Sequence, residues 1–190
     1  QAVLGQEDFL DAFADDPAVR AIGLHIEGLQ DIPRFERAAL KALSNGIPVV
    51  ALKTGSSVIG SALTVSHTGS LSGSAKLYEA LFERTGVISV TNPSQFLETL
   101  KFFCVVGAPK GLRVAGFTCS GGGATMLADY AEKVGLEFPP VDPAMESSLV
   151  ELLPDIATVS NPLDYTTPIW GQPEFTYPVF AKALSAMLSD

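Results

Sequence analysis

Short apolar runs alternate with longer amphipathic segments along nearly all of the sequence. Apolar runs bounded by turn residues, typical of buried strands, predict strands at 20–26, 47–55, 87–90 and 111–120. Apolar residues at helical spacing, together with proline or glycine at the ends, predict helices at 7–15, 33–46, 74–86, 93–103, 121–135, 142–153 and 173–190. Strands that alternate with helices form a parallel sheet covered by helices on both faces. The sequence therefore predicts a doubly wound α/β fold.

A change of composition at residues 105–111 (VVGAPKG) marks the best boundary between two domains. We expect one domain at 1–107 and a second at 112–190. The second contains a single predicted strand followed mainly by helices and loops. One strand does not make a sheet, so we expect this domain to be incomplete at its C-terminus and its sheet to be completed elsewhere.

Composition excludes several classes of protein. The 190 residues are 47% hydrophobic and 17% charged, which is rich enough for a buried core. The net charge of −9 argues against nucleic acid as a partner, because such binding needs clustered Lys and Arg. No apolar run approaches the about 18 residues of a membrane span, and no leader peptide is recognisable.

Cys104 and Cys119 form no metal-binding pattern and suit a reducing, cytoplasmic location. The chain begins with Gln1 rather than Met, so we expect a piece of a longer protein.

The segment FTCSGGGATMLADY, residues 117–130, places Ser120, Gly121, Gly122 and Gly123 between a predicted strand and a predicted helix. Main-chain N–H groups at a helix N-terminus bind anions, and glycines let the anion approach closely. The alternative is a tight turn without a ligand. The pattern matches neither the nucleotide-binding glycine motifs nor the hydrolase elbow.

A second unusual segment, TVSHTGSLSGS at 64–74, holds one of the two histidines, His67, among hydroxyl residues and glycines. Neutral imidazole is a good nucleophile toward phosphorus, and it needs a carboxylate to fix its tautomer. Glu27, at the carboxyl end of a predicted strand, is the best partner. The alternatives are a solvated loop histidine and a solvated acid.

Other residues are more ambiguous. His25 alternates with apolar residues inside a strand and is expected to be packed and structural. Lys53 fits either a surface position or a phosphate contact, and Asn161 and Asp164 lie in a segment that reads as a loop (SNPLDYT). Cys119 is expected to be a buried thiol. The aromatic residues at helical spacing are expected in the core: Phe9, Phe13, Phe96, Phe102 and Phe103.

In this order the segments closely resemble the ligase region of the NDP-forming acyl-CoA synthetases, relatives of succinyl-CoA synthetase that include ADP-forming acetate–CoA ligase. The resemblance rests on residues 46–103 with Ser-His-Thr-Gly at 66–69, on HIEGLQD at 25–31, on CSGGGATMLADYAEKVGL at 119–136 and on SNPLDYT at 160–166. It implies two central flavodoxin-like ligase domains, of which the second is truncated.

The resemblance also implies a reaction. Acyl-CoA and phosphate give an acyl phosphate, the histidine matching His67 takes the phosphoryl group, and ADP receives it, while Glu27 orients the ring. Two helix N-termini would hold the phosphate. The implied phosphate-binding residues are Ser66, Thr68, Gly69 and Ser70 at the first helix, and Ser120, Gly121, Gly122 and Gly123 at the second, with Lys53, Asn161 and Asp164 as further candidates.

Members of this family use CoA, ATP or ADP with Mg²⁺, phosphate and a small carboxylic acid. They carry a CoA-binding Rossmann domain and an ATP-grasp domain, in the same chain or on a partner subunit. Neither is recognisable here, so we expect this chain alone to be inactive and to associate with those domains in an oligomer. Two rival interpretations remain: a CoA-sensing module of an acetyltransferase fusion, and a scaffold that only docks a partner chain. Retention of His67 favours the enzyme.

Overall fold

A computed structural model describes residues 4–57, 59–60, 75–155, 157–165 and 171–188. It divides the chain into two compact units, Gln1–Pro109 and Lys110–Asp190. The assignment of 1–107 and 112–190 as two ligase-like domains stays a prediction. Each unit contains a parallel sheet and helices, which confirms the predicted α/β class.

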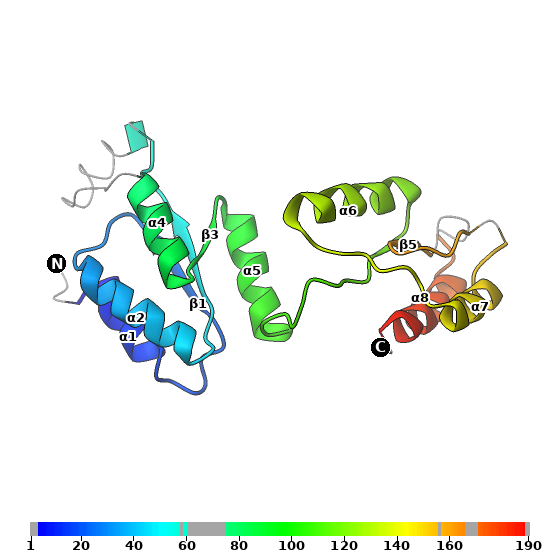
Figure 1. Cartoon of the computed structure of the whole chain (residues 1–190), viewed down its shortest axis with the longest axis horizontal. Helices are drawn as coiled ribbons and strands as arrows, with labels where there is room; N and C mark the ends of the chain where they lie inside the picture. The colour runs from blue at the N-terminus through cyan, green and yellow to red at the C-terminus, as the bar shows by residue number, and fades with distance from the viewer. Residues whose placement is uncertain (1–3, 58, 61–74, 156, 166–170, 189–190) are drawn as a thin grey trace. The chain divides into compact units, whose positions relative to one another are not determined.

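The first unit is built on the three-stranded parallel sheet β1–β2–β3, formed by Ile22–Ile26, Val49–Lys53 and Ile88–Val90. In its register, Ile22 lies opposite Val49 and Ile26 opposite Lys53, while Val50 lies opposite Ile88. The carboxyl ends of β1 and β2 therefore meet at the same edge of the sheet. Figure 1 shows this sheet beside its helices.

Helices cover both faces of this sheet. Helices α1 (Gln6–Phe13), α2 (Ile32–Ser44) and α4 (Ala75–Thr85) share one core with Ile22, Leu24 and Ile26 of β1. Gly23 points to the other face, where a Cβ atom would collide with Phe96 and Leu100 of α5 (Pro93–Val105). The predicted double winding is thus present in this unit.

The second unit contains the two-stranded parallel sheet β4 (Phe117–Thr118) and β5 (Leu163–Asp164). Helix α6 (Gly121–Val134) contacts both strands, and α7 (Pro143–Leu152) packs against α8 (Pro173–Met187) around Leu149, Leu163 and Ala183. Figure 1 shows β5 between α6 and the α7–α8 pair. The prediction of a single strand here is wrong, because Leu163–Asp164 was interpreted as a loop and forms β5.

Local signals explain where the helices begin and end. Asp31 and Asn92 cap α2 and α5 by accepting the N–H groups of Arg34 and Gln95, and each helix has a proline in its first turn. Gly135 ends α6 with φ of 73°, in the left-handed region that glycine adopts without strain. None of the helices within the described residues has the length and apolar character needed to cross a membrane.

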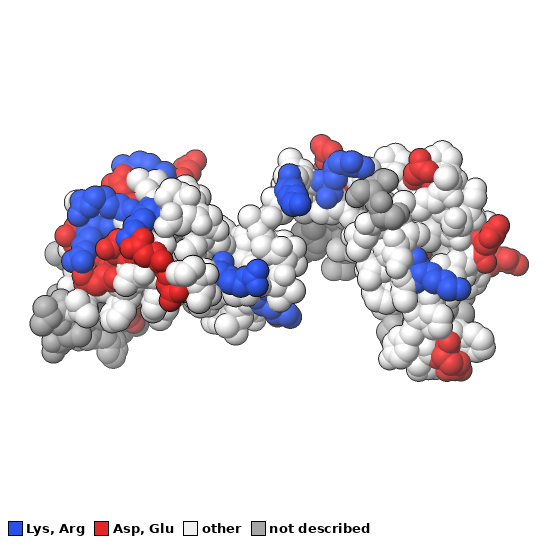
Figure 2. Space-filling view, turned by 90° about the horizontal axis from the view of Figure 1, so that it is seen from below, with Lys and Arg blue, Asp and Glu red and all other residues white. Residues whose placement is uncertain are grey.

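Charged side chains of both signs lie side by side over the first unit. Figure 2 shows the basic and acidic groups next to one another on this part of the surface. Arg34 pairs with Asp8, Lys41 pairs with Asp11 and Asp15, and Arg84 pairs with Glu36. Two of these four pairs join α1 to α2, the Lys41–Asp15 pair joins α2 to the turn that follows α1, and the fourth joins α2 to α4.

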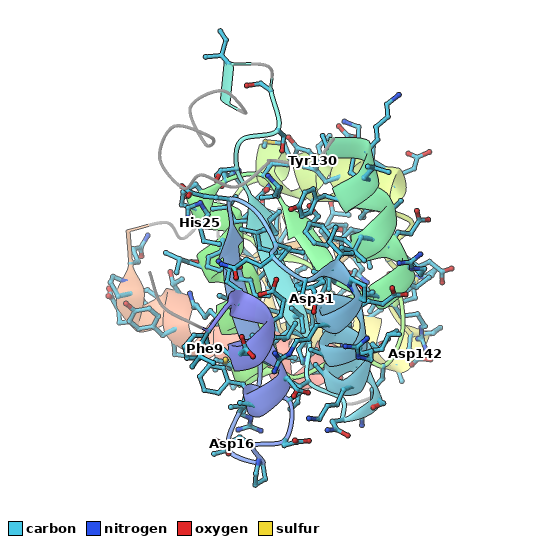
Figure 3. All side chains as sticks on the ribbon, turned by 90° about the vertical axis from the view of Figure 1, so that its left-hand side faces the viewer. Phe9, Asp16, His25, Asp31, Tyr130 and Asp142 are labelled. Atoms are coloured by element: carbon cyan, nitrogen blue, oxygen red, sulfur yellow. The ribbon has the colours of Figure 1, made fainter. Side chains whose placement is uncertain are left out.

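Two predictions about packing are wrong. Phe9, Phe13 and Phe102 are 50%, 46% and 42% exposed rather than buried, and Figure 3 shows Phe9 on the outer side of α1. Leu10, on the same helix, is fully buried and fills the core position. His25 is also exposed: it points away from the core that contains Leu24 and Ile26, and it remains exposed although α5 packs against the same face of β1 at Gly23.

Candidate functional site

The carboxyl edge of the first sheet gathers polar groups. Glu27 follows the last residue of β1, and Lys53 is the last residue of β2. The Nζ atom of Lys53 donates hydrogen bonds to the carbonyl oxygens of Glu27, at 3.1 Å, and of Thr54. Partial burial lowers the pKa of Lys53 below its usual range, and the negative charge of Glu27 opposes this shift. Ligand sites of parallel α/β sheets lie at this edge.

Glu27 is half-buried and lines a polar pocket of about 400 Å³ at the same edge. The pocket is also lined by His25, by Gly28 and Gln30 of the β1–α2 loop, and by Leu4–Glu7 at the start of α1. The Nε2 atom of His25 lies 3.0 Å from the Oγ1 atom of Thr54, within hydrogen-bonding distance. The exposed His25 therefore contributes to the edge that bears Glu27.

The loop that carries Glu27 is held by side chains from α1 and α4. The carboxylate of Glu7, only 2% exposed, accepts the N–H groups of Gln30 and Asp31 at 2.6 and 2.8 Å. The hydroxyl of Tyr78 accepts the N–H group of Leu29 at 3.1 Å. Sequence reasoning missed Glu7 and Tyr78, since their partners are main-chain groups far away in the sequence.

The histidine segment lies outside the described residues. This applies to His67 and to the four predicted phosphate-binding residues around it, Ser66, Thr68, Gly69 and Ser70. Their roles stay predictions. The described chain reaches this segment from both sides, since Thr54 follows β2 and α4 begins at Ala75.

The glycine turn of the second unit has the geometry of an anion site. Ser120 caps the 14-residue helix α6, and its Oγ atom accepts the N–H group of Gly123 at 3.0 Å. Gly121 and Gly122 are exposed, and within the described part of the chain their N–H groups have no acceptor. A Cβ atom on Gly122 would meet nothing within 4 Å, so there is space for a ligand. The positive end of the helix dipole adds to the attraction for an anion.

Thr118 is a residue of this turn that sequence reasoning missed. Its Oγ1 atom accepts the N–H group of Ser120 at 3.3 Å. A Cβ atom on Gly123 would collide with the same oxygen, so the turn closes this tightly only around glycine. A Thr two residues before the Ser-Gly-Gly-Gly run is the signal that was available. Cys119, between them, is half-buried rather than buried.

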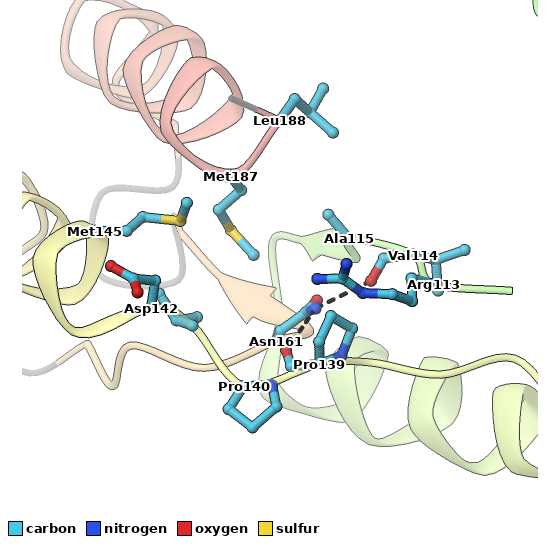
Figure 4. A pocket seen from close by; sticks show the side chains of 11 residues that line it. Arg113, Val114, Ala115, Pro139, Pro140, Asp142, Met145, Asn161, Met187 and Leu188 are labelled. Atoms are coloured by element: carbon cyan, nitrogen blue, oxygen red, sulfur yellow. Dashed lines mark hydrogen bonds between the residues drawn. The ribbon is translucent and has the colours of Figure 1, made fainter. Parts of the chain in front are cut away.

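The two further candidates in SNPLDYT lie at opposite ends of β5. Asp164, at the carboxyl end, places its Oδ2 atom 4.0 Å from the Cβ position of Gly121 and so belongs to the glycine turn. Asn161 precedes the strand. Its Oδ1 atom accepts the N–H group of Gly116, and its Nδ2 atom donates to the carbonyls of Val114 and Pro139 (Figure 4). These bonds occupy the amide, so its geometry is that of a structural residue.

Asn161 also lines a pocket of about 230 Å³ in the second unit (Figure 4). Arg113, Pro139, Pro140, Met145 and Met187 line it too. Because Asn161 and Arg113 precede β5 and β4, this pocket lies at the amino ends of the strands, away from the glycine turn. Among the described residues, no three His, Cys, Asp or Glu side chains lie close enough to share a metal ion.

Residues 1–103 match the family described as the succinyl-CoA ligase-like flavodoxin domain. The chain belongs to this family of NDP-forming acyl-CoA synthetases. The resemblance inferred from the motifs is therefore confirmed.

Several proteins are similar to this chain in sequence or in structure. The α subunit of ADP-forming acetate–CoA ligase II from Pyrococcus furiosus is 38% identical over 87% of this chain, which covers 36% of that protein. A trans-feruloyl-CoA synthase from an unknown prokaryotic organism is 30% identical over the whole chain, which covers 26% of it. The solved dinucleotide-forming acetyl-coenzyme A synthetase 1 of Ca. Korarchaeum cryptofilum, in complex with phosphate and ADP, is 25% identical, with a TM-score of 0.75. In that comparison 86% of this chain covers 35% of the other.

The chain thus spans between about a quarter and about a third of the length of these relatives. A solved protein from Pyrococcus horikoshii, with a TM-score of 0.77 and 26% identity, gives the same proportion, because 98% of this chain covers 37% of it. The flavodoxin-like fold predicted from the resemblance is confirmed.

Proposed function

We propose that this chain is the central part of an NDP-forming acyl-CoA synthetase that passes a phosphoryl group through His67. Phosphate attacks the acyl carbon of acyl-CoA and releases CoA, which leaves an acyl phosphate. A ring nitrogen of His67 then forms a bond to phosphorus as the carboxylate leaves, and ADP finally takes the phosphoryl group to become ATP. The acyl group and the choice between ADP and GDP depend on regions outside this chain.

The glycine turn carries this proposal. Two exposed N–H groups, of Gly121 and Gly122, at the positive end of α6 favour a phosphate or phosphoryl group. Ser120 and Thr118 hold the turn in shape, so its donors need little reorganisation when charge develops on the phosphoryl oxygens. Asp164 lies beside the turn, where a carboxylate repels phosphate and can hold a cation that accompanies a nucleotide.

Glu27 supports the second part of the proposal. A carboxylate at the carboxyl edge of a parallel sheet is suitably placed to accept an N–H group from an imidazole and to stabilise its charged form. Its loop is fixed by Glu7, Lys53 and Tyr78, which suits a group that must orient a ring.

The substrates and partners follow from the family. We expect CoA, ADP or ATP with Mg²⁺, phosphate and a small carboxylic acid to be the reactants. A CoA-binding Rossmann domain and an ATP-grasp domain would hold CoA and the nucleotide. The coverage of only about a third of the relatives' length supports the need for such further domains or subunits.

Labelling with acetyl [³²P]phosphate tests the proposal in the full-length protein that contains this chain, because the phosphoryl donor needs neither CoA nor nucleotide. We expect acid-labile, base-stable label on the wild type and none on His67→Ala. The matched control is His25→Ala, which changes the other histidine and should remain labelled. If the folded full-length wild type takes up no label from acetyl [³²P]phosphate or from [γ-³²P]ATP with Mg²⁺, the phosphohistidine proposal is wrong and a CoA-sensing module becomes the better interpretation.

A further inference from the structure

The ammonium group of Lys53 joins the two loops at the carboxyl edge of the first sheet. One of its hydrogen bonds goes to the carbonyl of Glu27, in the loop after β1. Another goes to the carbonyl of Thr54, in the loop after β2. A single side chain thereby fixes the main chain of Glu27 relative to the start of the segment that leads to His67.

Tyr78 of α4 completes the arrangement from the other side of that segment. Its ring centre lies 4.7 Å from the Nζ atom of Lys53, a distance at which a cation is attracted to the ring face. Its hydroxyl accepts the N–H group of Leu29, two residues after Glu27. Tyr78 is only 6% exposed, so its ring is fixed by the surrounding core.

Placing the Lys53 ammonium in a partly buried position is unfavourable, and packing of its side chain alone does not account for a charged group there. Partial burial disfavours its charged form, as the lowered pKa indicates. An apolar side chain of similar length would avoid this cost, but it would leave two carbonyls without these donors and would not link the loops. The ammonium is therefore a specific connection between main-chain groups rather than a solvated surface charge.

We propose that Lys53 is a positioning residue for phosphoryl transfer. With Tyr78, it fixes the loop that carries Glu27 relative to Thr54 and α4, which flank the histidine segment. This inference rests on the proposed function, because it assigns Lys53 a role in the geometry of the Glu27–His67 pair. It does not require Lys53 to touch the phosphoryl group.

Lys53→Met tests the inference, since it keeps the length of the stem and removes the donors. We expect the rate of labelling by acetyl [³²P]phosphate to fall about 10- to 100-fold, the effect of a misplaced catalytic group. The acetyl phosphate concentration that gives half the maximal rate should not change, because the proposal gives Lys53 no contact with the phosphoryl group. Lys101→Met is the matched control, because Lys101 is exposed on α5 and its one ion pair among the described residues is with Glu98; it should label at the wild-type rate.

Chemical rescue separates positioning from general stability. In Lys53→Ala the missing atoms are those of propylammonium, so this cation should restore much of the labelling rate. Tetramethylammonium has the charge but no N–H donor and should not restore it. If the Lys53 variants fail to fold, Tyr78→Phe gives a second test, because it keeps the ring and removes only the acceptor for Leu29; it should lower the rate without changing the half-saturating concentration.

The outcomes distinguish this inference from the proposed function. A folded wild type that takes up no label overturns both. A labelled wild type together with Lys53→Met at the wild-type rate overturns the role of Lys53 and leaves the phosphohistidine proposal intact. The inference is also overturned if the Lys53 variants label more slowly only in proportion to a lower melting temperature and propylammonium does not restore the labelling rate. Lys53 would then be structural only.

Discussion

The hydroxyl of Thr118 occupies the space that a side chain at Gly123 would need. The same hydroxyl accepts the N–H group of Ser120, and Ser120 in turn accepts the N–H group of Gly123. The hydroxyls of Thr118 and Ser120 thus close the turn at the start of α6, and both lie beside Gly123, which has no Cβ atom. The outer residues of the turn, Gly121 and Gly122, are left exposed.

Gly123→Ala should therefore disrupt this turn. Because the new methyl group collides with Thr118, we expect the free energy of unfolding to fall by about 1–3 kcal/mol, as for other overpacked sites. Inorganic phosphate should bind at least about tenfold more weakly, equivalent to about 1.4 kcal/mol. Urea unfolding and isothermal titration with phosphate measure the two effects.

Gly122→Ala is the control for this prediction. A Cβ atom there meets nothing within 4 Å, and alanine in a helix is favoured over glycine by about 0.5–1 kcal/mol. We expect this variant to be as stable as the wild type or slightly more stable. Equal losses of stability in both variants would show that the contact with Thr118 does not determine the result.

Glu7 should stabilise the loop that carries Glu27. Glu7→Ala removes the acceptor of the N–H groups of Gln30 and Asp31, and we expect the free energy of unfolding to fall by about 2–3 kcal/mol. Glu7→Gln keeps an acceptor oxygen and should lose less. Urea unfolding gives the free energies, and hydrogen exchange at Gln30 and Asp31 should accelerate in Glu7→Ala.

Glu79→Ala provides the comparison for Glu7→Ala, because Glu79 is an exposed acid on α4. A surface change of this kind is usually within about 0.5 kcal/mol of the wild type. If Glu7→Ala were equally mild, the buried carboxylate would not hold the loop, and its two short hydrogen bonds would have little net value.

The sequence predicted where the helices begin and end better than it predicted which of their side chains are buried. Helix limits were predictable because local residues determine them, such as Pro93 at the start of α5 and Gly135 at the end of α6. Periodicity identified an apolar face at Phe9 and Phe13, but it does not show what covers that face. The short strand β5 was missed because the turn residues Asn161 and Pro162 directly precede it.

In the candidate site, too, local geometry could be predicted from the sequence, whereas contacts between distant residues could not. The geometry of the Ser120–Gly123 turn was predictable because it depends on consecutive residues and on the helix that follows. The contacts of Glu7 and Tyr78 depend on N–H groups 23 and 49 positions away, which no local pattern reveals. Lys53 is a candidate from the sequence, but its donation to main-chain carbonyls follows only from the pairing of β1 with β2.

Asn161 should be important for stability rather than for phosphate binding. Asn161→Ala leaves Gly116 without its acceptor and Val114 and Pro139 without their donor, so we expect a loss of about 2–3 kcal/mol in the free energy of unfolding. Phosphate affinity, measured by titration at a temperature where the variant is folded, should equal that of the wild type. A stable variant that loses phosphate affinity would instead place Asn161 in the binding site.

Asp11 should give the first unit a pH-dependent stability. The pKa of Asp11 is lowered from 3.8, first because its Oδ1 atom accepts a hydrogen bond from Lys41 at 2.8 Å. The folded chain therefore holds the ionised form more strongly than the unfolded chain does. This contribution is present above pH 3.8 and is lost as the pH falls below 3.8 through the lowered pKa of the folded state.

We expect Asp11→Asn to be slightly less stable than the wild type at pH 7, because exposed ion pairs contribute little. The difference should shrink as the pH falls below 3.8 and also when salt screens the pair at pH 7. Urea unfolding of both proteins across this range measures it, with Asp129→Asn, an exposed acid on α6, as the comparison. A difference that persists unchanged at the lowest pH would mean that Asp11 stabilises the fold by packing and not through its charge.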